Sequence, residues 1–537
     1  MTEVPAMAHT IEDQPYFDPT AYGSGPDDCV TDPCENGAVT QHTVKIRGTE
    51  IAYTARAGHL TTRDPYSARP AATIFYVSFS SNAPNSCARP VTFFYNGGPG
   101  SSSVFLLLGS FGPRRIKTNY PHFTPPATYE MQDNQDSLLD QSDLVFLNPV
   151  GTGYSAAIAP SRNRDFWGVD EDARCIRQFI KRYLTAFNRW NSPKFLFGES
   201  YGTPRTCVLA WLLHEDGVDL NGVILQSSVL DYAQANNPVG LLPTLAAIAW
   251  YHDKVTLFPR LPDLRSFLKE VKHFTRKLYG PAKDGFPNVD PKVLRFLSEI
   301  LGIPQEVLHY WKLDPSTSFL TSLLLDEGRA LGAYDGRVTA EDTGIAGSVD
   351  PNSGGNDPTM NAIGGVYTAM WNEYLRNELK FESLSPFIDM NDQAFQNWNF
   401  AHVDPTGAEK GGKAALYTAG DLAAAMSLNQ YLRVFSANGY YDAVTPFFQA
   451  ELNLEKMLLS SSSRTRGNLE LHNYESGHMI YLDDRSRTGM KAHLAEFYAK
   501  SISAAHGQAA ALMALAATKR ETISYSPYQR RVGRTPY

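Results

Sequence analysis

The chain has 537 residues, which is enough for one large elaborated domain or a few smaller ones around a substantial core. Hydrophobic residues make up 43% and charged residues 19%, a mix typical of globular proteins, and the net charge of −8 argues against a nucleic-acid-binding protein. No stretch approaches the roughly 20 consecutive apolar residues of a membrane helix, so no membrane span is predicted.

Residues 1–40 are rich in Asp, Pro and Gly and have little periodicity, which predicts an extended N-terminal arm. The first residues contain neither a basic start nor an apolar run, so they do not have the pattern of a secretory signal. Five cysteines are too few for a disulfide scaffold. Cys29 and Cys34 could close a small loop, and two free thiols are the alternative.

Predicted strands and helices alternate between residues 41 and 230. Alternating apolar and polar residues predict β-hairpins over 42–58. Apolar side chains recur every three or four residues over 170–187, which predicts a helix, and 203–213 has a second helical pattern. Short apolar strands are predicted at 91–95, 143–148, 194–197 and 222–226.

Residues 231–400 interrupt this alternation with several helical patterns and a Gly-, Asp- and Ser-rich stretch, so we expect a cap inserted into the main domain. The alternation resumes with strands at 432–439 and 469–474, and a last helix is predicted near 490–502. The predicted units are an arm (1–40), a catalytic domain (41–230 and 401–504), a cap (231–400) and a poorly packed tail (505–537).

Alternating strands and helices predict the α/β class, with a mainly parallel central sheet and helices on both of its faces. In such sheets, ligands bind at the carboxyl ends of the strands. The segment 96–100 and the residues Ser200, Asp442 and His478 all follow predicted strands. We therefore expect the functional site at this edge of the sheet.

The pattern Gly-x-Ser-x-Gly occupies residues 198–202, directly between a predicted strand and a predicted helix. A sharp turn there requires small residues at Gly198 and Gly202, and it makes the serine hydroxyl stand clear of the sheet. Serine is a weak nucleophile and needs a base with an orienting acid. Ser200 is therefore the candidate nucleophile, and an ordinary turn serine is the alternative.

Two later strand ends supply an acid and a base, Asp442 and His478, in the chain order Ser, Asp, His that hydrolases of this class use. A helix cap for Asp442 and a hydrogen-bonded loop histidine for His478 are the alternatives. The backbone N–H groups of Gly98 and Tyr201 are predicted to form the oxyanion hole, because a glycine lets the backbone approach the developing charge.

Five blocks of the sequence resemble the serine carboxypeptidase family: "FFYNGGPGSSS", "LNPVGTGYSA", "FGESYGTP", "YYDAVTP" and "ESGHMIY". They occur in the order of the family, each at a predicted strand end, and the resemblance extends from about residue 45 to 500. Details such as "FGPRR" resemble a bacterial-type branch. The resemblance implies an α/β-hydrolase with a helical cap that needs no cofactor and removes single residues from the free carboxyl end of peptides.

The same resemblance implies that Asn96, Gly97 and Glu199 bind the substrate, with Asn96 and Glu199 hydrogen-bonded to its terminal carboxylate. Two facing carboxyl groups must share a proton, because close negative charges repel. We therefore expect Glu199 to be protonated when substrate is bound, and peptide hydrolysis to favour acidic pH. A simple turn at 96–98 and a solvated or differently paired Glu199 are the alternatives.

The chain departs from the family at two positions. Ser110 stands where the family usually carries a second glutamate, and Tyr440 stands where a further acid is common. The first change removes one member of the carboxylate-binding network, so it bears on exopeptidase specificity more than on hydrolysis. Arg114 or Arg115 could offer a charge instead.

Two other classes of function compete with a carboxypeptidase. An esterase, amidase or acyltransferase would use the same triad, and Ser110 favours it. A non-catalytic binding protein could keep the fold, but candidates at all three triad positions argue against it. The histidines lack metal-ligand spacing, so no metal site is predicted. The expected partners are peptide substrates, and the localisation lies between cytoplasmic, from the chain start, and periplasmic or secreted, by resemblance.

Overall fold

The computed structural model describes residues 12–83, 88–257, 261–342, 357–407, 416–457 and 467–520, with side chains described up to residue 503. Within these ranges no helix has both the length and the apolar character required to cross a membrane. The segment 407–414 mimics a phosphate-binding loop in sequence but lacks its final Ser or Thr, so no such loop is predicted, and all of it except Gly407 lies outside the described residues.

The strands of the central sheet are β2 (Gly37–Ile46), β3 (Thr49–Arg63), β4 (Pro70–Ser81), β5 (Val91–Tyr95), β8 (Asp143–Leu147), β9 (Ala156–Ala157), β10 (Lys194–Glu199), β11 (Gly222–Gln226), β15 (Arg433–Gly439) and β16 (Leu469–Tyr474). Among the described residues they form one sheet in the order β16-β15-β11-β10-β5-β8-β4-β3-β2, with β9 beside β4. The strands from β16 to β8 are parallel to their neighbours, whereas β4, β3 and β2 extend the sheet in antiparallel fashion. The predicted α/β class with a mostly parallel sheet is confirmed.

The other strands in the described ranges pair in small two-stranded sheets: β1 (Tyr16–Asp18) with β14 (Phe381–Ser383), β6 (Arg114–Ile116) with β7 (Met131–Asp133), and β12 (Arg329–Leu331) with β13 (Thr339–Glu341). The α-helices are α1 (Val169–Ala186), α2 (Gly202–Glu215), α3 (Pro238–Tyr251), α4 (Leu264–Phe274), α5 (Gly280–Asp284), α6 (Pro291–Leu301), α7 (Gln305–Tyr310), α8 (Phe319–Ser322), α9 (Pro358–Asn377), α10 (Asp392–Gln396), α11 (Ala419–Leu428), α12 (Phe447–Lys456) and α14 (Asp484–Arg520). Shorter or wider helical turns are η2 (Leu106–Phe111), η3 (Leu138–Asp140), η4 (Asn163–Phe166), η5 (Tyr232–Gln234), η6 (Thr275–Tyr279), η7 (Pro315–Thr317), η8 (Leu325–Glu327) and η9 (Ile480–Leu482).

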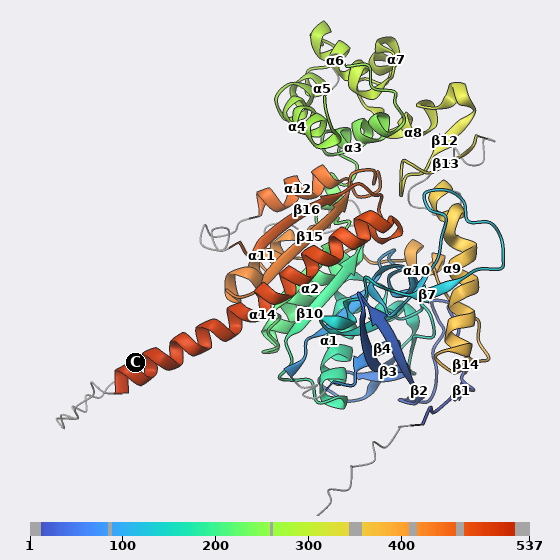
Figure 1. Cartoon of the computed structure of the whole chain (residues 1–537), viewed down its shortest axis with the longest axis vertical. Coiled ribbons are helices and arrows are strands. Elements are labelled where there is room, and N and C mark those ends of the chain that lie inside the picture. Colours follow the sequence, from blue (N-terminus) through green and yellow to red (C-terminus); the bar gives the residue numbers. More distant parts are fainter. Residues whose placement is uncertain are drawn as a thin grey trace, which may run out of the picture.

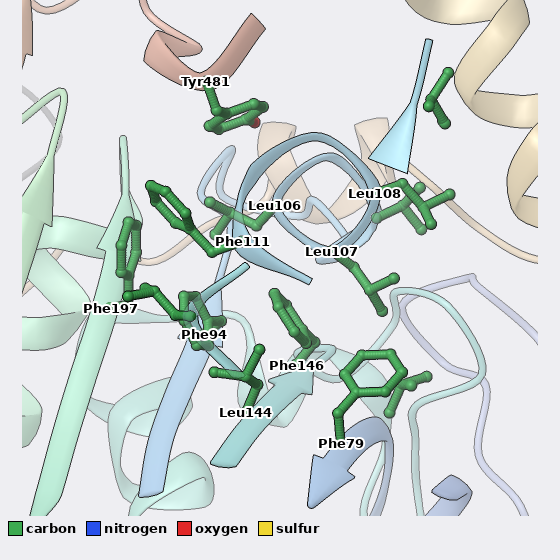
Figure 2. Close-up of a cluster of buried hydrophobic side chains, with 14 of the residues drawn as sticks. Phe79, Phe94, Leu106, Leu107, Leu108, Phe111, Leu144, Phe146, Phe197 and Tyr481 are labelled. Atoms are coloured by element: carbon green, nitrogen blue, oxygen red, sulfur yellow. The ribbon is translucent and has the colours of Figure 1, made fainter. Parts of the chain in front are cut away.

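Helices cover both faces of the central sheet (Figure 1), and apolar side chains fill the space between the helices and the sheet on each face. One layer contains side chains of α1, α2 and α11, and the other contains side chains of η2, α9 and α14. In the second layer, the Phe94 ring of β5 stacks on Phe146 of β8 and Phe197 of β10, with centroid distances of 4.5 and 4.8 Å. The helix η2 lies over these rings (Figure 2). This close packing fixes the positions of β5, β8 and β10 and therefore of the turns that follow their carboxyl ends.

The segment predicted as a cap packs into two different cores. The helices α3 to α8 share a separate apolar core and stand together above the end of the sheet in Figure 1. The side chains of α9 and β14 pack instead into the core beneath the central sheet. The predicted domain boundaries stay predictions, and the packing favours α3 to α8 as the cap proper.

The N-terminal arm pairs with strands of the main body, and the C-terminal helix α14 extends further than predicted. In the arm, β1 pairs with β14, and Gln14 exchanges backbone hydrogen bonds of 2.7 and 2.9 Å with Val39 of β2. Cys29 and Cys34 are free thiols. At the other end α14 continues to Arg520, so the helix predicted to end near residue 502 is longer, while 521–537 lie outside the described residues.

Candidate active site

Ser200 occupies the turn between β10 and α2 in a backbone conformation that serine rarely adopts, with φ of +60°. A Cβ atom on Gly198 would lie 2.1 Å from the Gly202 carbonyl oxygen, and one on Gly202 would lie 2.9 Å from the Tyr95 carbonyl oxygen. The turn therefore requires both glycines, as predicted. Ser200 is partly exposed, whereas Glu199 and Tyr201 on either side are buried. This strained geometry presents the hydroxyl at the strand end.

Asp442 and His478 follow the neighbouring strands β15 and β16 and are in direct contact. His478 Nδ1 lies 2.8 Å from Asp442 Oδ2. The other oxygen, Oδ1, accepts the backbone N–H groups of Val444 and Thr445 at 2.9 Å, and the Thr445 hydroxyl donates to Oδ2 at 2.6 Å. These bonds hold the Asp442 carboxylate in the orientation that directs the imidazole.

The pKa of His478 reflects two opposing effects. Burial lowers the pKa of the imidazole, but the charge and hydrogen bond of Asp442, together with the charges of Glu199 and Asp357, outweigh it, so the pKa of His478 lies above its ordinary value. A carboxylate that stabilises the imidazolium form in this way also stabilises the proton that a general base takes up.

Ser200 and His478 lie on linked turns at the same sheet edge. The Ser200 N–H donates to the Gln226 carbonyl at the end of β11, and the next residue, Ser227, donates its hydroxyl to the His478 carbonyl at 2.6 Å. Within the described part of the chain, no hydrogen bond joins the Ser200 hydroxyl to the His478 imidazole. Such bonds are often long in unliganded hydrolases and tighten when substrate binds.

The two predicted oxyanion-hole donors come from adjacent turns: Tyr201 directly follows Ser200, and Gly98 lies in the turn after β5. Gly98 has φ of +98°, a conformation that favours glycine. Among the described residues, the N–H groups of Gly98 and Tyr201 have no protein acceptor. A Cβ atom on Gly97 would lie 2.5 Å from the Tyr201 nitrogen and 2.9 Å from Ser200 Cβ. The glycine turn after β5 therefore contacts the serine turn closely and leaves both N–H groups available.

Glu199 is buried beside Ser200 and receives two side-chain donors. Asn96 Nδ2 donates to its Oε2 at 2.9 Å, and the Tyr481 hydroxyl donates to the same oxygen at 3.0 Å. The Leu106 N–H donates to Asn96 Oδ1 at 3.1 Å, which fixes the side-chain amide with its NH2 group toward Glu199. Burial raises the pKa of Glu199 to about 7, against the opposing effects of His478 and these donors. Asn96 and Glu199, predicted to act together, are in contact.

The positions that depart from the family contact other groups. The Ser110 hydroxyl is buried and donates to the Leu106 carbonyl within η2. Arg114 pairs with Asp133 and Glu378, and Arg115 pairs with Asp484 at 3.2 Å. Both arginines therefore have ion-pair partners other than Glu199. Tyr440 packs its ring edge-on against Phe447.

Three side chains at this site have no role in the sequence-based prediction: Tyr481, Thr445 and Tyr334. Tyr481 and Thr445 each lie three residues after a predicted triad residue, inside the blocks "ESGHMIY" and "YYDAVTP", and this position is the signal that could have found them. Tyr334 comes from the segment predicted as a cap, and its ring meets the His478 imidazole edge-on at a centroid distance of 5.1 Å. The described residues contain no cluster of His, Cys, Asp or Glu side chains that could hold a metal ion.

The parallel sheet, the serine turn between a strand and a helix, and the later acid and histidine define the class of α/β-hydrolase folds. Residues 48–253 match the family model for serine carboxypeptidases. This segment, which contains Asn96, Glu199 and Ser200, is similar to serine carboxypeptidases, as its motifs predict. Asp442 and His478 lie outside the matched segment, and the bacterial-type branch stays a prediction.

Similar proteins include serine carboxypeptidase-like 2 of Arabidopsis thaliana, 24% identical over 45% of this chain and 52% of that protein. Vitellogenic carboxypeptidase of Aedes aegypti is 24% identical over 39% of this chain and 49% of that protein. The chain thus spans about half the length of these curated relatives, or less. Among solved structures, proline iminopeptidase of Mycobacterium smegmatis aligns over 87% of this chain and 100% of its own, at 11% identity and a TM-score of 0.34.

Proposed function

We propose that the protein is a serine-type carboxypeptidase that hydrolyses the C-terminal residues of peptides through an acyl-enzyme. The observation that carries this proposal is the Glu199 carboxyl group. It is buried directly beside Ser200, hydrogen-bonded by Asn96 at 2.9 Å, and has a pKa raised to about 7. Such a group can hold a proton and share it with the free carboxylate of a peptide.

In this mechanism, the Ser200 oxygen attacks the scissile carbonyl while His478 takes up the hydroxyl proton and Asp442 orients the imidazole. The N–H groups of Gly98 and Tyr201 donate to the oxyanion. When the C–N bond breaks, the imidazolium gives its proton to the leaving amine. Water then attacks the acyl-enzyme, again with His478 as the base, and the acid is released.

Substrate selection in this proposal depends on the free carboxyl end of the peptide. Asn96 and Glu199 bind the terminal carboxylate, and Gly97 lets the peptide approach because its backbone lies against the serine turn. Tyr481 donates to Glu199 as well and keeps its carboxyl group in place. Asn96, Glu199 and Tyr481 together form what we call the clamp for the terminal carboxylate, and Tyr481 is its member beyond the two predicted residues.

The direct test is mass spectrometry of a mixed peptide pool after incubation with the wild type or with Ser200→Ala. We expect the wild type to shorten peptides by single residues from the carboxyl end, and Ser200→Ala to leave them intact, because the nucleophile is lost. Shortening by both proteins, or internal cleavage alone, would contradict the proposal.

An esterase, amidase or acyltransferase with the same triad is the second candidate, and Ser110 in place of an acid favours it. Peptides with a free C-terminal acid and their C-terminal amides separate the two. A carboxypeptidase prefers the free acid strongly, because its clamp is built for a carboxylate, whereas an amidase or esterase cleaves blocked substrates at least as well. Absence of serine-directed fluorophosphonate labelling would instead favour a non-catalytic protein.

A further inference from the structure

The tip of the β12–β13 hairpin reaches from the inserted segment to the candidate triad. It consists of residues 333–337, which we call the strap, and the Gly332 N–H closes its base with a 2.9 Å bond to the Val338 carbonyl. In Figure 1 this hairpin lies between the helices of the inserted segment and the body of the protein. The strap contacts both loops that carry the acid and the base.

Three backbone hydrogen bonds join the strap to these loops. The Ala443 N–H donates to the Ala333 carbonyl at 2.9 Å, and the Gly336 N–H donates to the Tyr441 carbonyl at 3.0 Å, so the bonds flank Asp442 on both sides. The His478 N–H donates to the Tyr334 carbonyl at 2.6 Å. The strap is therefore bonded to one triad residue itself and to both neighbours of the other.

Arg337 adds side-chain bonds from the same strap. Its guanidinium group pairs with Asp335 at 2.8 Å and with Asp483 at 3.0 Å, and it donates to the Glu475 carbonyl at 3.0 Å. The side chains of Arg337 and Asp335 are only 6% and 0% exposed. A planar guanidinium can hold several acceptors in fixed directions, which a flexible ammonium group cannot do.

The contact between the strap and the His478 loop leaves no spare room. A Cβ atom on Gly477 would lie 2.4 Å from both the Tyr334 carbonyl oxygen and Asp335 Cβ. The strap is also held from behind, because Asp357 and Thr359 at the start of α9 accept the N–H groups of Ala333 and Asp335 at 2.6 and 3.1 Å. Because the strap is packed between the His478 loop and the start of α9, it keeps one position.

The sheet topology explains why the His478 loop needs such support. Among the strands that the structure describes, β16 lies at the edge of the central sheet and has β15 as its one neighbour. The loop after β16 therefore lacks the flanking loop that supports the turns of central strands. The strap bonds to this loop through the His478 N–H and the Arg337 guanidinium.

We propose that the strap is a positioning element of the active site, with Arg337 as its main positioning residue, and that it holds the His478 loop against Asp442 so that the carboxylate orients the imidazole for proton transfer from Ser200. This inference rests on the proposed triad, because it assigns to the strap the alignment of two triad members.

The test compares wild type, Arg337→Met and Arg337→Lys by the rate of fluorophosphonate labelling of Ser200 and by kcat and KM for a peptide. We expect Arg337→Met to lower the labelling rate and kcat on the order of 10- to 100-fold, because small misplacements of catalytic groups have effects of this size. KM should change little, since no hydrogen bond joins the strap, all of which the structure describes, to Asn96 or Glu199. Arg337→Lys keeps the charge and should recover part of the loss.

A second measurement needs neither substrate nor label. The Nδ1 proton of His478, hydrogen-bonded to Asp442, should give a strongly downfield proton resonance in the wild type, and Arg337→Met should shift or broaden it. Arg189→Met is the matched control, because Arg189 is a buried, ion-paired arginine at the opposite ends of the strands. It should lose stability without changing the resonance or the labelling rate of the folded protein.

The two proposals fail in different ways. A wild type that fluorophosphonate does not label contradicts the proposed hydrolase. An Arg337→Met variant with the wild-type labelling rate and an unchanged His478 resonance would contradict the positioning role of the strap. An Arg189→Met variant that slows labelling equally would contradict it as well.

Discussion

The Glu199 carboxyl group is buried between the candidate nucleophile and the Tyr481 hydroxyl. Burial raises its pKa to about 7, while the nearby His478 imidazole, Tyr481 and Asn96 act to lower it and Asp442 acts to raise it. Below this pKa the group is a neutral acid that can donate a hydrogen bond to a carboxylate. Above it, the group is an anion that repels one.

For peptides with a free C-terminal acid, KM should therefore rise as the pH rises through about 7, where Glu199 loses its proton. Glu199→Gln keeps a neutral donor at all pH values and should remove this rise. The measurement is KM against pH for a free-acid peptide and its amide. Because the amide has no carboxylate to repel, its profile reports His478 alone. A KM that stays flat for the free acid would contradict the assigned role of Glu199.

Tyr481→Phe is the second variant for this measurement. The Tyr481 hydroxyl donates to Glu199 and lowers its pKa, so its removal should move the rise in KM to higher pH. Tyr498→Phe removes another buried tyrosine hydroxyl, which contacts Thr92 at 2.7 Å, and should leave the profile in place.

At the scale of elements, the turn between β10 and α2 is a strained connection that packing on both sides maintains. Ser200 adopts a positive φ, while Gly198 and Gly202 face the backbone and Thr206 without space for a side chain. Strain of this kind persists only where the surrounding structure imposes it. The stacked rings beneath β5 and β10 provide that constraint.

Gly198→Ala should destabilise the protein by about 1–3 kcal/mol or more, because the added methyl group would meet the Gly202 carbonyl oxygen at 2.1 Å and Thr206 Oγ1 at 2.4 Å. Gly364→Ala in α9 is the matched control, because nothing lies within 4 Å of the place that its added methyl group would take. It should stabilise by about 0.5–1 kcal/mol, since alanine loses less backbone entropy in a helix. Chemical denaturation measures both, and equal midpoints would contradict the expectation.

At the scale of the whole molecule, a buried ion pair connects one helical layer to the site. Arg205 of α2 pairs with Asp172 of α1 at 2.6 Å and donates to the Asn96 carbonyl at 2.7 Å. The same guanidinium lies over the rings of Tyr95 and Tyr201, 5.4 and 5.3 Å from their centroids. One buried cation thus holds α1, α2 and both turns of the predicted oxyanion hole together.

Asp172→Asn should cost about 3–5 kcal/mol of the free energy of unfolding, because it leaves the Arg205 charge buried without its partner. Glu130→Gln breaks the exposed pair with Lys117 and should change stability little, since water screens such pairs. Thermal or urea unfolding compares the two variants. A small effect of Asp172→Asn would mean that water or another group compensates Arg205.

Much of this organisation is readable from local sequence. The predicted helical face of α1 is buried, including Ile176, Phe179 and Tyr183, and the predicted strand at 91–95 matches β5. The β2–β3 hairpin is predicted within 42–58, but the pairing of β4 with β8 and the return of α9 to the main core are not visible in this way. They depend on which apolar faces meet, and many pairings are compatible with the same periodicity.

The sequence alone determined the elements whose form depends on near neighbours: the strand ends, the glycines of the serine turn, and the order of Ser200, Asp442 and His478. Tertiary structure alone decided that Tyr481 donates to Glu199 and that Arg337 reaches the His478 loop. Steric limits on a turn act over a few residues and leave a pattern in the sequence. Burial and hydrogen bonding between distant segments leave none, so the raised pKa of Glu199 and the contacts of the strap with the proposed triad exist only in the folded chain.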